Sequence, residues 1–217
     1  MKILLLSLTY AVGVGELILA VYFWVTNSKS EIRKVVALLG FATAMWGISN
    51  AVTGVILNEW DVYANIFGPL LLTALIHLAI IFPHRLFTFD RFHAAALYGL
   101  WALFSYLVLG TDTIVVDMYV RNNAAYTTSG PLFTLFNIYL GALYFCGLGL
   151  LVWKIRRLDG AARRNTKILF WSLLIAGLPG VFFAIFHFMK DVPFNYLYGP
   201  ISSVVWLGAT MYIVRKS

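Results

Sequence analysis

Glu16 is the residue whose type and place in the sequence most call for a chemical explanation, because it lies inside the first long apolar run, in the stretch VGVGELILA. Charged side chains at membrane depth are costly and are usually tied to function. Low dielectric disfavours the charged form of a carboxyl group, so we expect a neutral acid that donates one hydrogen bond. Gly13 and Gly15 precede it and leave room for a neighbouring helix or a ligand.

Two other apolar runs also place polar and aromatic residues at helical spacing, so that they share one helix face. Together with Glu16, these stripes predict a cavity that opens to the outer side of a membrane. The alternative is hydrogen bonding between helices, which contributes about 0.6 kcal/mol per bond. The stripes are Trp46, Asn50 and Thr53 in one run, and Phe133, Asn137, Gly141 and Tyr144 in the other. The predicted ligand contacts are Glu16, Asn50 and Asn137, with Tyr10 and Trp46 as aromatic walls.

The spacing of the histidines argues against metal and haem chemistry. A zinc hydrolase needs closely spaced ligands, and a bis-histidine haem needs two imidazoles at one depth on facing helices. His77, His84, His93 and His187 satisfy neither pattern. The last apolar run also lacks the lysine that a retinal protein needs. We therefore predict no metal, no cofactor and no catalytic site, and we interpret the single Cys146 as a small packing residue.

Composition sets the fold class. Of the 217 residues, 61% are hydrophobic and only 12% are charged, whereas a soluble domain carries about 25% charged residues. The apolar runs reach the ~20 residues needed to cross a bilayer as a helix. We therefore predict an all-α, polytopic membrane protein: a single domain over residues 1–217 that forms a bundle of seven transmembrane helices. The expected spans are 3–25, 35–57, 62–82, 92–109, 131–155, 168–189 and 199–214.

The basic residues predict the orientation of the spans. Thirteen of the 16 Lys and Arg lie after the first, third and fifth spans or after the seventh, if Lys154 at the end of the fifth span is counted with the connection that follows it. Because cytoplasmic loops carry the excess of Lys and Arg, the N-terminus should be outside and the C-terminus cytoplasmic. The formal charge of +7 then reflects topology and gives no reason to expect nucleic acid as a partner. Anionic lipid headgroups should instead contact the basic connection after the fifth span, through Arg156, Arg157, Arg163 and Arg164.

Two local patterns add detail to the helix bundle. The segment TIVVDMYV, then RNN and AAYTTSG, predicts a short outer β-hairpin between the fourth and fifth spans, with its turn at Asn122 and Asn123. This hairpin is either a lid resting on the helix ends or a simple linker. In the sixth span, Pro179 removes a backbone hydrogen bond and should bend the helix, and Gly177 lets a neighbour approach. The bend is either static or a hinge.

Several segments resemble the seven-helix N-terminal sensor region of bacterial membrane histidine kinases. They include FATAMWGISNAV, LIHLAIIFPHR, GPLFTLFNIYLGALYF and YGPISSVVWLGATMYIVRKS, and the likeness extends over about residues 35–217. It implies the bacterial inner (cytoplasmic) membrane, a homodimer, and a last helix that runs into a cytoplasmic signalling module. It assigns no role to Glu16. Its fixed points are Trp46, Phe82-Pro83, Gly130, Tyr139, Gly160, Arg163, Gly199-Pro200 and Arg215.

The sequence therefore predicts a membrane-embedded sensory domain. It would receive an extracytoplasmic or membrane-borne signal, such as a small-molecule ligand, and transmit it inward through the seventh helix, with Pro179 as the hinge. The alternative is a non-catalytic helix-bundle subunit or lipid-binding scaffold of a larger membrane complex.

The split of the basic residues gives a first testable prediction. A reporter that is active only in the periplasm, fused after Ser217, should give no signal, because the seventh helix should end on the cytoplasmic side. Strong reporter activity at this position would overturn the predicted topology.

Overall fold

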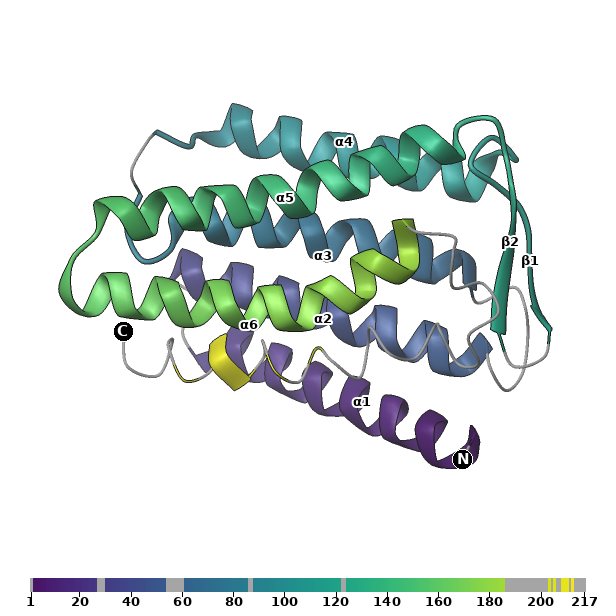
Figure 1. Ribbon diagram of the computed structural model, residues 1–217, viewed down its shortest axis with the longest axis horizontal. Coiled ribbons are helices and arrows are strands. Elements are labelled where there is room, and N and C mark those ends of the chain that lie inside the picture. The colour runs from purple at the N-terminus through teal and green to yellow at the C-terminus, as the bar shows by residue number, and fades with distance from the viewer. Residues whose placement is uncertain are drawn as a thin grey trace.

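Helices make up most of the computed structural model, and they run side by side along its long axis (Figure 1). The structure describes residues 2–26, 30–53, 61–85, 88–121, 124–185, 203, 205, 208–210 and 212. These residues form six helices and one antiparallel pair of strands. The helices are α1 (Lys2–Thr26), α2 (Glu31–Thr53), α3 (Asp61–Ile81), α4 (Arg91–Gly110), α5 (Phe133–Arg157) and α6 (Gly160–Ile185), and the strands are β1 (Val115–Arg121) and β2 (Ala124–Ser129).

Five of the helices, α1 to α5, are long and apolar enough to cross a membrane. A helix of 25 residues such as α5 is about 37 Å long at 1.5 Å per residue, which exceeds the ~30 Å of a hydrocarbon core. The apolar character of these helices suggests membrane insertion. Further helical residues, among them Ser203 and Gly208–Thr210, lie within the expected seventh span, whose other residues are largely outside the described part.

The predicted spans agree closely with α1, α3, α4 and α5, whereas α2 and α6 begin earlier than expected. The larger difference is at α6, which begins at Gly160 and not near Ile168. Most of the expected basic loop is therefore helical, and Leu158 and Asp159 alone separate α5 from α6. The Asp159 carbonyl accepts from the amide of Arg163, which opens the helix, and alanine and arginine are good helix formers.

Helix α3 occupies the centre of the bundle, where it packs against α2, α4 and α5 and also contacts β1. Residues Thr73 to Phe82 are all buried, so this helix is covered on every side over its second half. Pro69 lies within α3 and cannot donate to the carbonyl one turn earlier. Next to that turn, the indole of Trp101 on α4 donates to the carbonyl of Ile66 at 3.0 Å. This bond joins α4 to the part of α3 that proline weakens.

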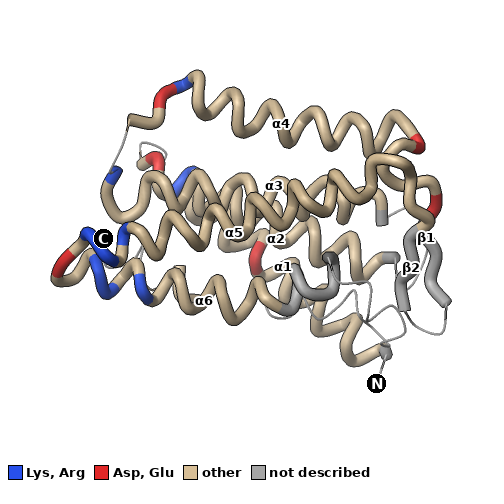
Figure 2. The backbone as a smooth tube through the Cα atoms, turned by 45° about the horizontal axis from the view of Figure 1, so that its top comes forward, with Lys and Arg blue, Asp and Glu red and all other residues tan. Residues whose placement is uncertain are grey.

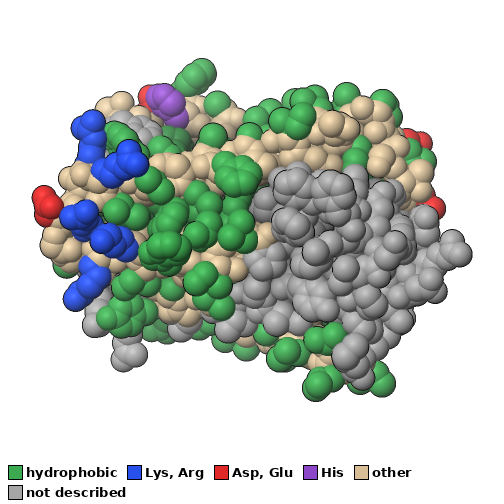
Figure 3. Space-filling model, viewed as in Figure 1, with side chains coloured by type: hydrophobic (Ala, Val, Ile, Leu, Met, Phe, Trp, Pro, Cys, Tyr) green, Lys and Arg blue, Asp and Glu red, His purple; other side chains and the backbone are tan. Residues whose placement is uncertain are grey.

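Exposed basic side chains gather at one end of the bundle, which we call the basic end (Figures 2 and 3). Figure 2 shows that the connections from α3 to α4 and from α5 to α6 both lie there, while the strands lie at the opposite, hairpin end. The exposed residues that define the basic end are Lys34, Arg85, Arg91, Arg156, Arg157, Arg163, Arg164 and Lys167.

Lys154 differs from these residues, because its side chain is completely buried. The sequence counts it among the cations of a loop, but it belongs to the last turn of α5 and points into the bundle. Its ammonium group donates to three backbone carbonyls at the end of α3: Ile80 at 2.7 Å, Phe82 at 2.6 Å and His84 at 2.9 Å. The last carbonyls of a helix have no partner within the helix and carry partial negative charge. Lys154 thus caps α3 from the neighbouring helix.

The predicted hairpin is present: β1 pairs with β2 in antiparallel fashion, with Arg121 opposite Ala124. The expected turn residues, Asn122 and Asn123, lie outside the described residues. The base of the hairpin is part of the core, since Ile114 is completely buried and Val115 nearly so. Gly130 closes this base by donating to the Ile114 carbonyl at 2.9 Å. A Cβ atom at Gly130 would lie 2.3 Å from the backbone oxygen of Asp112, so only glycine fits there.

Gly177 on α6 does let a neighbour approach, as predicted. The neighbour is Tyr144 of α5, whose ring would lie 2.5 Å from a Cβ atom at this glycine. The hydroxyl of Tyr144 donates to the carbonyl of Leu173 at 3.1 Å. Helix α6 continues through Pro179 to Ile185, and its ribbon changes direction towards the C-terminal end (Figure 1).

The burial of Lys154 leads to a prediction about stability. Lys154→Met should lower the free energy of unfolding by about 1–3 kcal/mol, because buried carbonyls lose their donor. The measurement is denaturant unfolding in detergent micelles. Lys167→Met is the matched control, since Lys167 is an exposed lysine of α6, and it should change stability by less than about 0.5 kcal/mol. Equal effects of the two substitutions would contradict the capping role.

Candidate functional site

The candidate site is centred on Glu16, which lies in the middle of α1 and is only 2% exposed. The helix that buries it is α2, and the two helices approach each other closely. A Cβ atom at Gly13 would lie 2.8 Å from the side chain of Ile48 and 3.2 Å from the Ala44 carbonyl. On the α2 side, a Cβ atom at Gly40 would lie 3.6 Å from the backbone oxygen of Glu16. Small residues thus allow the backbones to meet on both sides of the carboxylate position.

The partner of the Glu16 side chain comes from the other end of the chain. The hydroxyl of Ser203 donates to Glu16 Oε1 at 2.5 Å, and both side chains are buried. Ser203 is a helical residue within the expected seventh span. The hydrogen bond therefore links the first helix of the bundle to a helical residue near the other end of the chain.

The two residues lie at matching heights if both helices run in the same direction. Glu16 stands ten residues before Thr26, where α1 ends. Ser203 stands eleven residues before Val214, the expected end of the seventh span. If the expected seventh span is one continuous helix, this is a difference of about 1.5 Å along the helix axes at 1.5 Å per residue, which is what two spans that run in the same direction would give.

The surroundings of the two glycines before Glu16 differ. A Cβ atom at Gly15 would meet no described atom within 4 Å, whereas at Gly13 the space is filled by α2. Of the two glycines expected to make room next to Glu16, Gly13 therefore admits a helix and Gly15 leaves an open position.

The two asparagines that were predicted to contact a ligand together with Glu16 have other surroundings. Asn50 is buried, and its amide donates to the carbonyl of Trp46 on its own helix at 2.7 Å. Asn137 is half-buried near the start of α5. The structure thus joins Glu16 to Ser203, a residue that the sequence interpretation did not include because a lone serine in an apolar helix carries no spacing signal.

The two aromatic residues also differ in their surroundings. Trp46 is half-buried, and its indole nitrogen would lie 3.7 Å from a Cβ atom at Gly68, so it packs against α3. Tyr10 is 53% exposed on α1. Trp46 is therefore placed between helices, while Tyr10 is on the surface of the bundle.

The four arginines expected at lipid headgroups are all exposed at the basic end. Arg156 and Arg157 close α5, and Arg163 and Arg164 open α6. The guanidinium of Arg157 lies 5.0 Å from the ring centre of Trp153, within the range of a cation–π contact.

Pro179 lies inside α6, but its side chain is outside the described part. In the described part of the chain, no three His, Cys, Asp or Glu residues are grouped so that they could hold a metal ion.

Comparison with known proteins gives no relative: no model of a known protein family matches the chain, and no curated protein matches it significantly.

The Glu16–Ser203 bond can be tested by coupling. Ser203→Ala and Glu16→Leu should each destabilise the protein, by about 0.6 kcal/mol or more, and the double variant should cost less than the sum of the two. Glu16→Gln should keep most of the stability, because the amide can still accept from Ser203. Unfolding in mixed micelles gives the free energies. Thr9→Val is the control, because the buried Thr9 hydroxyl donates to the Leu5 carbonyl of its own helix. Strict additivity of Glu16→Leu and Ser203→Ala would rule out the bond.

Proposed function

We propose that this chain is a membrane-embedded sensory domain that receives a signal from the outer side of a membrane, or from within it, and passes the signal inward through its last helix. The observation that carries the proposal is the buried hydrogen bond between Glu16 on α1 and Ser203. A contact of this kind connects a polar position deep in the bundle directly to the proposed output helix. The resemblance to sensor regions of bacterial histidine kinases supports the same direction of signalling.

The membrane topology is part of this proposal. The five apolar helices, together with α6 and the segment 199–214, would make seven spans. The basic end would face the cytoplasm, since Lys and Arg accumulate on that side, and the hairpin would face outward. The N-terminus would then be outside, the C-terminus inside, and the chain would reside in a bacterial inner membrane. Anionic headgroups would contact the arginines of α5 and α6.

The proposed mechanism is a shift between two arrangements of α1 and the last helix. A ligand shifts such an equilibrium only if it binds one arrangement more tightly than the other. In the described arrangement the Glu16 carboxyl is occupied by Ser203. A polar small molecule that enters beside Gly15 and competes for the carboxyl would release the last helix. Helices α1 and α2, which are locked together at Gly13 and Gly40, would serve as the fixed frame.

A direct test measures whether the last helix moves relative to this frame. Spin labels at Ile18→Cys and Val205→Cys, both exposed positions, with Cys146→Ser, report the distance by electron paramagnetic resonance in lipid nanodiscs. The proposal expects two distances whose ratio changes in Glu16→Gln. The control pair, Ile18→Cys with Phe41→Cys on α2, should give one unchanged distance. A single distance for the Ile18–Val205 pair, unaffected by Glu16→Gln, would contradict the sensory function.

A second candidate function follows from the surface of α4. This helix buries Phe104, Ser105 and Val108, while large apolar side chains on its other faces are exposed, namely Leu100, Leu103, Tyr106 and Leu109. Such a face suits lipid or a neighbouring helix, as in a structural subunit or lipid-binding scaffold of a larger complex. Native mass spectrometry of the purified chain distinguishes the two functions. A retained small molecule that is lost in Glu16→Gln favours the sensor, and a retained protein partner with no such molecule favours the subunit.

A further inference from the structure

A second buried polar contact lies at the basic end, far from Glu16, around His77 of α3. The ring is 9% exposed. Its Nδ1 atom lies 3.0 Å from the hydroxyl of Tyr98 on α4. Its Nε2 atom lies 3.5 Å from Glu31 Oε1 at the start of α2, and this buried nitrogen makes no hydrogen bond with any described residue. One imidazole thus stands between three helices, with one nitrogen bonded and the other facing a carboxylate slightly out of reach.

The neutral imidazole explains this asymmetry. A neutral ring has one N–H donor and one bare acceptor nitrogen. If the tyrosine hydroxyl donates to Nδ1, the proton of the ring is on Nε2 and points towards Glu31. Glu31 itself is held by another partner, because its Oε2 atom accepts from the guanidinium of Arg85. The carboxylate therefore neutralises Arg85, and His77 receives only a long contact.

The elements next to this contact carry further charged and titratable groups. Arg85 also donates to the carbonyl of Phe89 at 3.3 Å, and the Phe89 ring lies 4.9 Å from the ring of His77. At the start of α4, the backbone N–H of His93 donates to Asp90 Oδ1, and Nδ1 of the His93 ring lies 2.7 Å from the same oxygen. These two contacts hold the pKa of the Asp90 carboxyl below its usual range. From α5, the Lys154 ammonium is committed to backbone carbonyls.

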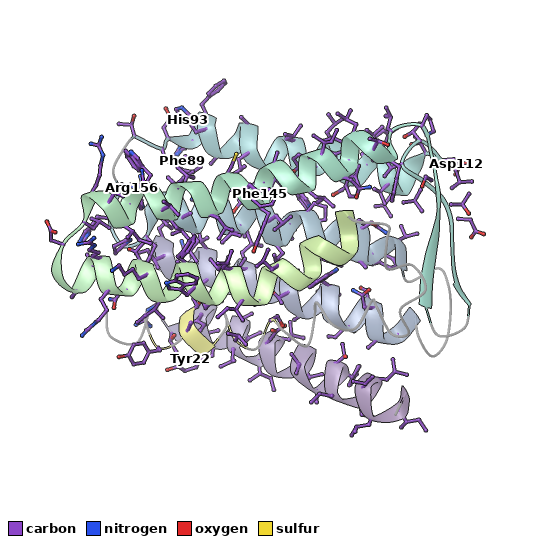
Figure 4. All side chains as sticks on the ribbon, in the orientation of Figure 1. Tyr22, Phe89, His93, Asp112, Phe145 and Arg156 are labelled. Carbon is purple, nitrogen blue, oxygen red and sulfur yellow. The ribbon has the colours of Figure 1, made fainter. Side chains whose placement is uncertain are left out.

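Figure 4 shows Phe89 and His93 at the end where Arg156 lies, with Asp112 at the opposite end. The side chain of Glu31 is 45% exposed. This carboxylate consequently brings water at the basic end next to the side of the ring that carries Nε2–H. The second proton enters at Nδ1, to which the Tyr98 hydroxyl passes its own proton while its oxygen takes up another from water.

We propose that His77 is a proton-operated latch that joins α2, α3 and α4 at the basic end. In the described arrangement the ring is neutral and the latch is open. A proton taken from water makes both ring nitrogens donors. Nε2–H then forms a charged hydrogen bond to Glu31, which must move closer than 3.5 Å. At Nδ1 the bond reverses, so that the ring donates and the tyrosine hydroxyl accepts.

The latch uses none of the residues of the Glu16–Ser203 contact. The latch would respond to the proton concentration at the basic end, whereas Glu16 would respond to a signal from the outer side or the middle of the membrane. Histidine suits this role because its charge changes near physiological pH. Closing the latch pulls the start of α2 towards α3, and α2 is the helix that is locked to α1. The movement therefore reaches the frame against which the last helix is positioned.

Nitrogen-15 NMR of the histidine rings in nanodiscs tests the protonation step. At pH 8 the His77 signals should show one protonated nitrogen, and by pH 5 they should show two. Glu31→Gln should move this transition to lower pH, because the carboxylate that stabilises the imidazolium is gone. His77→Gln identifies the signals, and His84→Gln is the control, since His84 is exposed and only its carbonyl bonds to Lys154. A His77 ring that keeps one tautomer from pH 8 to 5 would refute the latch.

Spin labels test the movement in the otherwise unaltered chain. With Cys146→Ser, labels at Lys34→Cys on α2 and Ala96→Cys on α4 should come closer by at least ~1 Å between pH 8 and pH 5. This change should disappear in His77→Gln. In Tyr98→Phe, which removes only the hydroxyl, the change in the distance between the labels should occur at a different pH. Labels at Leu103→Cys and Ile138→Cys, exposed and nearer the hairpin end, should not respond. An identical pH response in wild type and His77→Gln, or no response in wild type, would overturn the proposal.

Discussion

The position of the central helix depends on one ammonium group. Helix α3 lies at the centre of the bundle, and the carbonyls of Ile80 and Phe82 at its C-terminal end belong to buried residues. Lys154 reaches across from α5 and binds the carbonyls of Ile80, Phe82 and His84. Three donors meet three acceptors, so the charge is spread over the dipole end of α3. The same bonds fix the height of α5 against α3 and, through the short connection that follows, the start of α6.

On this frame the two polar contacts occupy different depths and different helix pairs. Glu16 joins α1 to the last part of the chain, and His77 joins α3 to α2 and α4. Both use a group whose proton content can change. The contact between His77 and Glu31 is long, at 3.5 Å, so it can still shorten, and the proposed latch depends on this.

The sequence predicted the helices well because their signal is local. Apolar runs of sufficient length gave α1, α3, α4 and α5 within a few residues, and β-branched residues around a pair of asparagines gave the hairpin. The start of α6 differs from the prediction, because its charged residues suggest a loop whereas arginine and alanine favour a helix. The contacts of the site were not predictable in the same way. Glu16 stands out from its apolar surroundings in the sequence, but Ser203 and Lys154 act through tertiary partners. From composition alone, a serine in an apolar helix carries no signal and a lysine is expected on the surface.

Tyr144 has a consequence for how α6 can move. Its ring occupies the notch that Gly177 leaves in α6, and its hydroxyl holds the Leu173 carbonyl one turn earlier. Because the Tyr144 ring fills this space, α6 cannot slide along α5 without first separating from it completely. Tilting about the ring requires no such separation. Tilting about the Tyr144 contact is therefore the motion open to α6. A small displacement of its arginine-rich end would then move the part beyond Pro179 in the opposite direction.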